Sequence, residues 1–256
     1  MRVLLIVLLA TSATAADSWS LTDKEQFLLT AQIESVAPAG KGLTGTKKAM
    51  LSDGHREHAA HIQTIDIYQP EFRGMDGSFE RDFKDSWKFN VAAYRLAKLL
   101  HLTTMVPAAV AREYEGRLAA FSWWIDDVMM DERERTRQNL VPADIEGWNR
   151  QLAVIRIFDQ LIFNVDRSQE NLLITKDWHI WMIDHTRALR KWPMLRRPDA
   201  VRECNPELLR WLKALRREDL ASTMGDLLTD EEIDGLMRRR DLIVGRVEAV
   251  GAAAGG

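Results

Sequence analysis

The sequence predicts an α+β fold of two lobes, a small β-rich N-terminal lobe and a mainly helical C-terminal lobe. Between residues 33 and 125, short apolar runs alternate with turn residues, a pattern typical of strands. After residue 142, apolar residues recur mainly at helical spacing. The 256 residues, 46% of them hydrophobic, are enough to form a core in two lobes. We expect an N-terminal lobe at 17–125, a C-terminal lobe at 126–250 and a flexible tail at 251–256.

The N-terminus is typical of a signal peptide over residues 1–16. Arg2 precedes an apolar run over 3–9, and Ala13-Thr14-Ala15 forms an Ala-x-Ala cleavage pattern. The run is too short to cross a bilayer, and no other segment is suited to do so. An uncleaved anchor is the alternative. The sequence therefore predicts an exported chain (periplasmic, secreted or in the lumen of the secretory pathway) with no transmembrane segment in its mature form.

Charge and cysteine content narrow the function classes. The formal net charge is −3, and removal of Arg2 leaves 34 basic against 38 acidic residues, or −4. This balance provides no global attraction to nucleic acid, so we expect no nucleic-acid partner. Cys204 is the only cysteine, which excludes an intrachain disulfide, and we expect it to be a buried small hydrophobic residue.

The first elements of the N-terminal lobe lead into a glycine-rich loop. Thr22 and Glu25 fit a capping box for a helix of about ten residues, and a strand is expected over 33–36. The loop over 38–46 contains Gly40, Gly42 and Gly45 and is accompanied by Lys41, Lys47 and Lys48. Glycine lets backbone N–H groups approach a phosphate closely. The loop lacks the ending of a Walker A motif, and a plain turn is the alternative.

Asp53-Gly54 predicts a hairpin between runs at 48–51 and 58–65. His55, His58 and His61 are three residues apart, so on a strand they would face opposite sides. We therefore interpret them as solvated side chains and not as a zinc cluster.

The rest of the N-terminal lobe is expected to contain one helix and two strands. A polar loop is predicted over 69–83, and Asp85-Ser86 would open a helix over 87–100. The predicted strands cover 103–112 and 117–125 around Glu115-Gly116, and 126–137 would be a surface connection.

The C-terminal lobe is predicted to be helical around one hairpin. The longest helix is expected over 143–163, followed by a hairpin of runs 172–174 and 180–183. The basic stretch 190–202 is interpreted as an irregular solvated loop, with contact to an acidic or phosphorylated substrate as the alternative. Further helices are expected over 206–215, 217–228 and, after a Thr229/Glu232 capping box, to about Val250.

Polar side chains at the ends of the predicted strands indicate a site for a metal ion and phosphate. Asp166 and Asn171 precede the C-terminal hairpin, and Asp184 follows it. Carboxylate and amide oxygens at such positions can hold Mg²⁺ against phosphates. A polar turn with no catalytic role is the alternative.

These residues form a pattern that resembles a known superfamily. The run Phe158-Asp159-x-Leu161-Ile162-x-Asn164-x-Asp166-Arg167-x-x-x-Asn171, followed by Asp184, resembles atypical branches of the protein-kinase-like superfamily. These branches are the phosphoinositide 3- and 4-kinases, the HipA-type bacterial kinases and the secretory-pathway Golgi casein kinases. Residues 92–96 and 99–107 also resemble the small lobe of bacterial members.

The resemblance implies a role for each matching residue. Asp166 would accept or orient the proton of an attacking hydroxyl, and Arg167 would stabilise the loop or a phosphate. Asn171 and Asp184 would hold Mg²⁺, or Mn²⁺, on the phosphates of ATP. The expected nucleotide-binding residues are Gly40, Gly42, Gly45, Lys48, Gln63 and Trp124.

Two positions depart from the superfamily pattern. Gln63 occupies the place of the usual strand lysine, and Asn90 lies near the place of the acidic partner on the following helix. We expect a neutral Gln63–Asn90 hydrogen bond there. The cation that contacts phosphate would come from elsewhere, with Lys48 as the first candidate and Lys41 or Lys47 as the next.

Several functions are compatible with this pattern. The first is an exported Mg²⁺-dependent phosphotransferase that moves the γ-phosphate of ATP to a protein, sugar or lipid hydroxyl. A pseudokinase, nucleotidyl transfer in the same pocket and an exported domain without a nucleotide are the alternatives. Export creates a constraint, because secretory organelles supply ATP whereas a bacterial periplasm is not expected to supply it richly.

Overall fold

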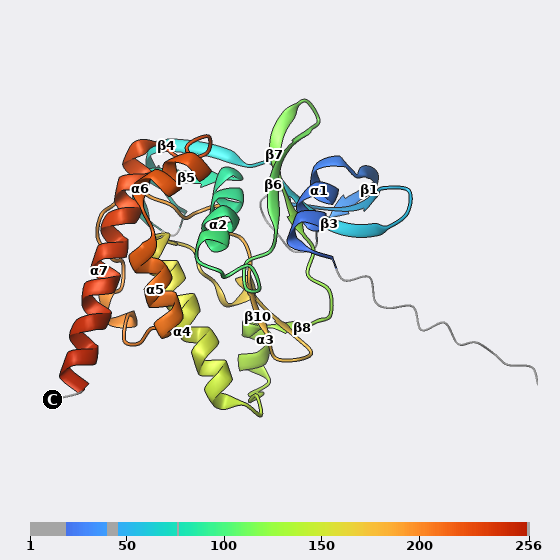
Figure 1. Ribbon diagram of the computed structural model, residues 1–256. Coiled ribbons are helices and arrows are strands. Elements are labelled where there is room, and N and C mark those ends of the chain that lie inside the picture. The colour runs from blue at the N-terminus through green and yellow to red at the C-terminus, as the bar shows by residue number, and fades with distance from the viewer. Residues whose placement is uncertain (1–18, 40–45, 76, 255–256) are drawn as a thin grey trace, which may run out of the picture.

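The computed structural model describes residues 19–39, 46–75 and 77–254, which form a β-rich N-terminal and a mainly helical C-terminal part (Figure 1). This confirms the predicted α+β, two-lobed fold class. The N-terminal part contains α1 (Leu21–Thr30), β1 (Gln32–Pro38), β2 (Lys47–Ser52), β3 (Glu57–Gln63), β4 (Asp66–Arg73), β5 (Phe79–Ser86), α2 (Lys88–Leu99), β6 (Ala109–Tyr114) and β7 (Arg117–Trp123). The C-terminal part contains β8 (Val128–Asp131), α3 (Glu132–Arg137), α4 (Ile145–Leu161), η1 (Gln169–Asn171), β9 (Leu172–Thr175), β10 (Ile180–Met182), η2 (Pro198–Ala200), α5 (Pro206–Ala214), α6 (Arg217–Met224) and α7 (Asp230–Ala254).

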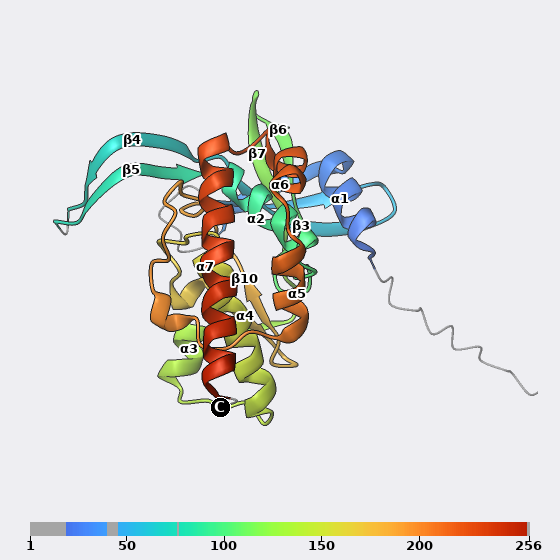
Figure 2. The ribbon, with the colours of Figure 1, turned by 60° about the vertical axis from the view of Figure 1, so that its left-hand side comes forward.

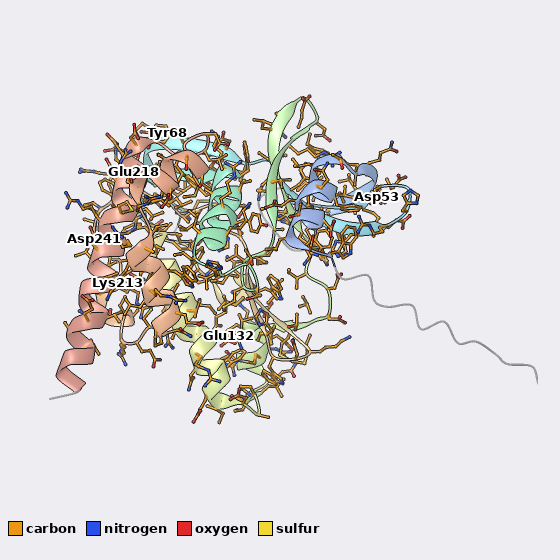
Figure 3. All side chains as sticks on the ribbon, in the orientation of Figure 1. Asp53, Tyr68, Glu132, Lys213, Glu218 and Asp241 are labelled. Carbon is orange, nitrogen blue, oxygen red and sulfur yellow. The ribbon has the colours of Figure 1, made fainter. Side chains whose placement is uncertain are left out.

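A five-stranded antiparallel sheet organises the N-terminal part, with strand order β1-β2-β3-β7-β6. Its buried face includes Ala60, Ile62 and Phe121, and α1 and α2 contact its β6–β7 half. The predicted β2–β3 hairpin is confirmed, and its turn residue Asp53 lies at the outer end of the sheet (Figure 3). Asp53 accepts hydrogen bonds from the backbone N–H groups of His55 and Arg56 at 2.9 and 2.8 Å, which fixes the turn.

The capping box of α1 lies two residues earlier than predicted. Ser20 accepts from the Asp23 backbone N–H at 3.1 Å, and the Asp23 carboxylate accepts from the Ser20 backbone N–H at 3.0 Å. The Ser20–Asp23 pair replaces Thr22–Glu25 because Ser20 has the extended backbone of an N-cap residue, whereas Thr22 is already helical. By contrast, the predicted Thr229–Glu232 capping box of α7 is present.

The polar loop predicted over 69–83 is wrong, because these residues form most of a long β4–β5 hairpin. The hairpin projects away from the body of the molecule (Figure 2), and Phe72 stacks on Phe83 across it with ring centroids 4.3 Å apart. Almost all of β4 is exposed, so it lacks the half-buried alternation by which a strand is predicted. At the base, Ser86 N–H donates to the Thr186 carbonyl at 2.9 Å and so ties the hairpin to the C-terminal part.

Three other predicted elements also need correction. Residues 126–137 are not only a connection, because β8 pairs with β9 and α3 follows it (Figure 3 labels Glu132 at its start). The strand predicted over 103–112 is β6, which begins at Ala109 and not at residue 103. The longest helix among the described residues is α7, with 25 residues, and not α4, with 17.

The basic stretch 190–202 is irregular apart from η2, as predicted, but it is not uniformly solvated. The Arg190 side chain is 1% exposed and donates to Glu80 and to the Lys84 carbonyl. Cys204 is half-buried, and burial raises the pKa of its thiol to about 11. No helix among the described residues is long and apolar enough to cross a membrane.

Helix α7 packs against α4, α5 and α6, and Gly235 on α7 allows a close approach of the basic loop. A Cβ atom at Gly235 would lie 2.5 Å from the Lys191 carbonyl oxygen, whereas at Gly245 nothing lies within 4 Å. Gly235→Ala should therefore destabilise the protein by about 1–3 kcal/mol, because backbone must move. Gly245→Ala should stabilise it by up to about 1 kcal/mol through helix propensity. Urea denaturation measures the free energy of unfolding of both variants. If both substitutions stabilise the protein, the close approach of Gly235 to the Lys191 carbonyl is contradicted.

Candidate active site

A network centred on Asp159 shapes the loop that follows α4. Asp159 lies in the last turns of α4 and is buried. Its Oδ1 accepts from Asn164 Nδ2 at 3.1 Å, and the buried Asn164 accepts from the Asp166 backbone N–H at 3.0 Å. The loop therefore folds back onto the helix that precedes it, and Asp166 projects from a fixed backbone.

Arg167 connects this loop to the strand ends that carry the predicted metal ligands. Its Nε and Nη2 donate to the Asp159 carboxylate at 3.0–3.2 Å. Its Nη1 donates to the carbonyls of Asn171 at 3.2 Å and Ile183 at 2.7 Å. The guanidinium is engaged by these acceptors, so the structure gives Arg167 a positioning role within the loop.

Asn171 and Asp184 are brought together where β9 begins and just beyond the end of β10. The Ile183 N–H donates to the Asn171 carbonyl at 3.0 Å, so the backbones of the two segments lie side by side. Asn171 Nδ2 is directed to the Asp166 carbonyl at 3.4 Å, and Asp184 is exposed. Asp184 also has a φ of 53°, a left-handed backbone that is uncommon outside glycine and that clusters at functional sites.

The donor chemistry here fits a magnesium ion held jointly by protein and phosphate. Within the described residues, no group of three or more His, Cys, Asp or Glu is arranged to hold a metal ion alone. Magnesium commonly binds through one or two carboxylates, water and the phosphates of a nucleotide. The Asp184 carboxylate and the Asn171 amide oxygen match that requirement.

Negative charge accumulates around Asp184 and is only partly neutralised. Partial loss of hydration raises the pKa of Asp166; Arg187 opposes this shift, whereas Asp184 and Glu80 add to it. Burial also raises the pKa of Asp85, with contributions from Asp184 and Asp166, and its Oδ1 has no hydrogen-bond partner among the described residues. A divalent cation at Asp184 would relieve the repulsion among these carboxylates.

One face of the N-terminal sheet carries His61 and Lys48, and the charge of Asp184 acts on His61. Burial lowers the pKa of the His61 imidazole on β3, and the nearby Asp184 charge opposes that shift. Lys48 pairs in register with His61 and therefore lies on the same face of the sheet. Lys48 Nζ lies 4.0 Å from the centroid of the Trp124 ring, and the backbone N–H of Trp124 donates to the Ala59 carbonyl where the chain leaves β7.

The other candidate cations lie elsewhere. Lys47 pairs with Ile62, on the opposite face from Lys48, and its Nζ donates to Tyr114 at 3.1 Å and to Glu115 at 3.2 Å. Lys41, Gly40, Gly42 and Gly45 lie outside the described residues. Three lysines were candidates to replace the strand lysine. Among the described residues, Lys48 is the one that shares the sheet face of His61.

Two solved structures resemble the chain over most of its length. The structure of Fam20 from hydra with sugar has a TM-score of 0.66 and 14% identity, and the alignment covers 91% of this chain and 89% of that chain. The proinflammatory kinase CtkA from Helicobacter pylori has a TM-score of 0.54 and 10% identity, with coverage of 89% and 96%. No protein-family model and no curated protein matches the sequence. The chain has an atypical protein-kinase-like fold.

The kinase-like fold is retained here without the expected Gln63–Asn90 hydrogen bond. Gln63 Oε1 accepts from the backbone N–H groups of Thr64 at 3.0 Å and Ile65 at 3.1 Å, so this side chain turns back on its own strand end. Asn90 on α2 accepts from the His185 backbone N–H at 2.7 Å. Asn90 thus connects α2 directly to the residue after Asp184, and the two neutral residues act separately.

Sequence reasoning missed three residues of this kinase-like site. His61 was interpreted as solvated, although it shares its face with Gln63, a residue already placed at the site, and period-two alternation was the available signal. Asp85 was taken only as part of a helix start. Asp159 belongs to the motif, but the sequence predicted no role for it. Its hydrogen bonds with Arg167, eight residues later, depend on how the loop folds back and not on helical periodicity.

Proposed function

We propose that this protein is an exported, Mg²⁺-dependent phosphotransferase that moves the γ-phosphate of ATP to a hydroxyl acceptor. The observation that carries the proposal is the Arg167 network, which joins the Asp166 loop, Asn171 and the segment before Asp184 in one place. The kinase-like fold and its kinase neighbour support a phosphotransferase at this coarse level. Export rests on the signal-peptide pattern at residues 1–16.

Each residue of the site has a distinct task in this proposal. Asn171 and Asp184 would hold the metal ion, whose positive charge supplies electrostatic stabilisation to the transferring phosphate. Asp166 would orient the acceptor hydroxyl and take its proton. Arg167 would position these groups through Asp159 and the two carbonyls. Lys48 and Trp124 would contact the nucleotide, and Mn²⁺ is compatible with the same oxygen donors.

Nucleotide binding by the purified mature chain tests the proposal. A saturating complex of ATP and Mg²⁺, at about a hundred times its Kd, should raise the melting temperature by roughly 5–10 °C. Asp184→Ala should abolish the Mg²⁺-dependent part of that shift. Asp177→Ala, which removes an exposed carboxylate from the turn at the other end of the β9–β10 hairpin, should retain it. The absence of any response of the wild-type protein to nucleotide under Mg²⁺ or Mn²⁺ would contradict the proposal.

One observation favours a second candidate, a pseudokinase that binds nucleotide as a regulatory module. Gln63 stands in place of the strand lysine, and its amide is engaged by Thr64 and Ile65. A module of this kind would bind nucleotide without turnover. Phosphoryl transfer that is lost in an Asp166 variant would exclude it, and mass spectrometry of the product would separate an added phosphate from an added nucleotide.

A further inference from the structure

A basic pocket lies beside the loop that carries Asp166, on the side of the β4–β5 hairpin. Its cavity measures about 570 Å³, within the range of small-molecule sites. The hairpin, the start of the Asp166 loop and the basic loop after β10 contribute its walls. The lining residues include Arg81, Arg187, Arg190 and Arg196, the single carboxylate Glu80, and the aromatic residues Phe72, Phe79, Phe163 and Trp192.

The pocket carries more positive charge than its own carboxylate can neutralise. Four guanidinium groups and one carboxylate correspond to a net charge of +3 among the lining residues. Glu80 accepts from both Arg187 and Arg190, the latter at 2.8 Å. Among the described residues, neither Arg81 nor Arg196 is paired with a carboxylate. The surplus is therefore available to an anion.

Arg190 provides an independent sign that this wall suits an anionic ligand. Its side chain is 1% exposed, and its Nη1 has no hydrogen-bond partner among the described residues. A buried, partly unsatisfied guanidinium is costly unless a negative charge lies nearby. Two arginines that share one carboxylate at the inner wall would be stabilised by a second anion in the cavity.

The pocket adjoins the residue that directly precedes the proposed catalytic residue. Val165, which lines the pocket, directly precedes Asp166, and its N–H donates to the Arg187 carbonyl at 3.2 Å. The Arg187 charge also acts on the Asp166 carboxylate. A molecule anchored by an anionic group in the pocket would therefore extend toward Asp166.

We propose that this pocket is the acceptor subsite and that it selects a small phosphorylated polyol, such as a sugar phosphate. Guanidinium forks match the geometry of phosphate oxygens, and the volume of the pocket suits a small molecule. The aromatic side chains would contact the carbon frame of the acceptor. This inference rests on the proposed phosphotransferase function and adds the substrate class to it.

The transfer step balances with the residues present. The acceptor oxygen forms a bond to the γ-phosphorus, and the bond from that phosphorus to the β–γ bridging oxygen breaks. ADP leaves with the bond's electron pair, and the proton of the acceptor hydroxyl passes to the Asp166 carboxylate. The phosphate already on the acceptor stays on the pocket arginines and takes no part in bond changes.

Binding of glucose 6-phosphate to the mature protein without nucleotide tests the subsite. Titration calorimetry should show binding of glucose 6-phosphate, weaker binding of inorganic phosphate and none of glucose. Arg81→Gln should weaken glucose 6-phosphate binding at least about tenfold, the loss expected for one charge-assisted contact. Arg210→Gln is the control: it removes the same charge from an exposed position on α5 that does not line the pocket, so affinity should stay within about threefold.

A turnover measurement separates failure of this inference from failure of the proposed function. Glucose 6-phosphate should stimulate consumption of ATP, and Arg81→Gln should raise the KM for glucose 6-phosphate while the KM for ATP stays unchanged. ATP and Mg²⁺ binding with no glucose 6-phosphate binding, or equal effects of Arg81→Gln and Arg210→Gln, would overturn the subsite alone. Binding of a glutamate-rich peptide in place of the sugar phosphate would overturn the substrate class. Glucose 6-phosphate binding without any response to ATP would instead contradict the phosphotransferase function, and with it the acceptor role.

Discussion

Asp159→Ala should destabilise the protein by about 3–5 kcal/mol, the cost of leaving one partner of a buried ion pair uncompensated. The Asp159 and Arg167 side chains are each 12% exposed, and the carboxylate accepts from both Arg167 and Asn164. Its removal leaves the Arg167 guanidinium without its main acceptor in a region with little water. Urea denaturation with circular dichroism measures the loss, and an unchanged slope would show that the denatured state is not altered.

The effect on the site should accompany the loss of stability. Arg167 holds the carbonyls of Asn171 and Ile183, so a released Arg167 should also weaken the binding of ATP and Mg²⁺ at temperatures where the variant is still folded. Glu170→Ala is the control, because Glu170 lies in the same loop and forms an exposed pair with Arg133. Exposed pairs contribute about 0–1 kcal/mol, so this variant should be nearly neutral.

A double variant makes the test specific to the pair. If Asp159 and Arg167 act on one another, Asp159→Ala with Arg167→Ala should cost less than the sum of the two single changes, by roughly 0.5–3 kcal/mol. Additive losses would show that the two residues contribute to stability through separate contacts.

The sequence predicted those parts of the fold in which local patterning and burial agree. The β2–β3 hairpin has a strong turn signal at Asp53-Gly54, and the β9–β10 hairpin and the helices of the C-terminal part have clear apolar periodicity. The β4–β5 hairpin was missed because β4 is almost fully exposed and its stability comes from strand pairing, which leaves no hydrophobic pattern. Its polar composition, with Pro70, Gly74 and Gly77, instead indicated a loop.

In the site too, residues that are close in the sequence could be predicted, whereas contacts between distant elements could not. Asp166 and Asn171 lie close together before a predicted hairpin, so their place in the sequence and the resemblance to kinase-like proteins were enough to select them, whereas Asp159 received no role. The partners of Gln63 and Asn90 depend on how the sheet and α2 sit against the residue after Asp184, and side-chain reach cannot be derived from the sequence. The charge of the hairpin pocket was equally hidden, because Arg81 and Arg196 are 115 positions apart (196 − 81) and meet only in the folded chain.

Asp166→Asn should lower the rate of phosphoryl transfer by about 10²–10⁴-fold, the usual contribution of a positioned general base. Asparagine keeps the size of the side chain, and the bond from the residue 166 backbone N–H to Asn164 is preserved, so the loop should keep its shape. Binding of ATP and Mg²⁺ should therefore stay close to that of the wild type. Single-turnover measurements distinguish this loss of chemistry from a loss of binding, and Glu170→Gln, an isosteric change in the same loop, is the control.

The pH dependence of the rate offers a second, independent measurement on Asp166. The carboxylate must be ionised to accept a proton, so the rate should rise as pH rises through the pKa of Asp166. In the metal-free protein this pKa lies above the ordinary value of 3.8, and a cation at Asp184 would lower it. The Arg187 charge opposes that upward shift. Arg187 also lines the acceptor pocket, so the profile is measured at saturating acceptor concentration. Arg187→Gln removes the opposing charge, so the pKa of Asp166 should rise further and the acidic limb of the profile should move to higher pH. If the acidic limb does not move in Arg187→Gln, or if Asp166→Asn leaves the rate unchanged, Asp166 does not take the proton. The structure would then support nucleotide binding by this site but not a general base at residue 166.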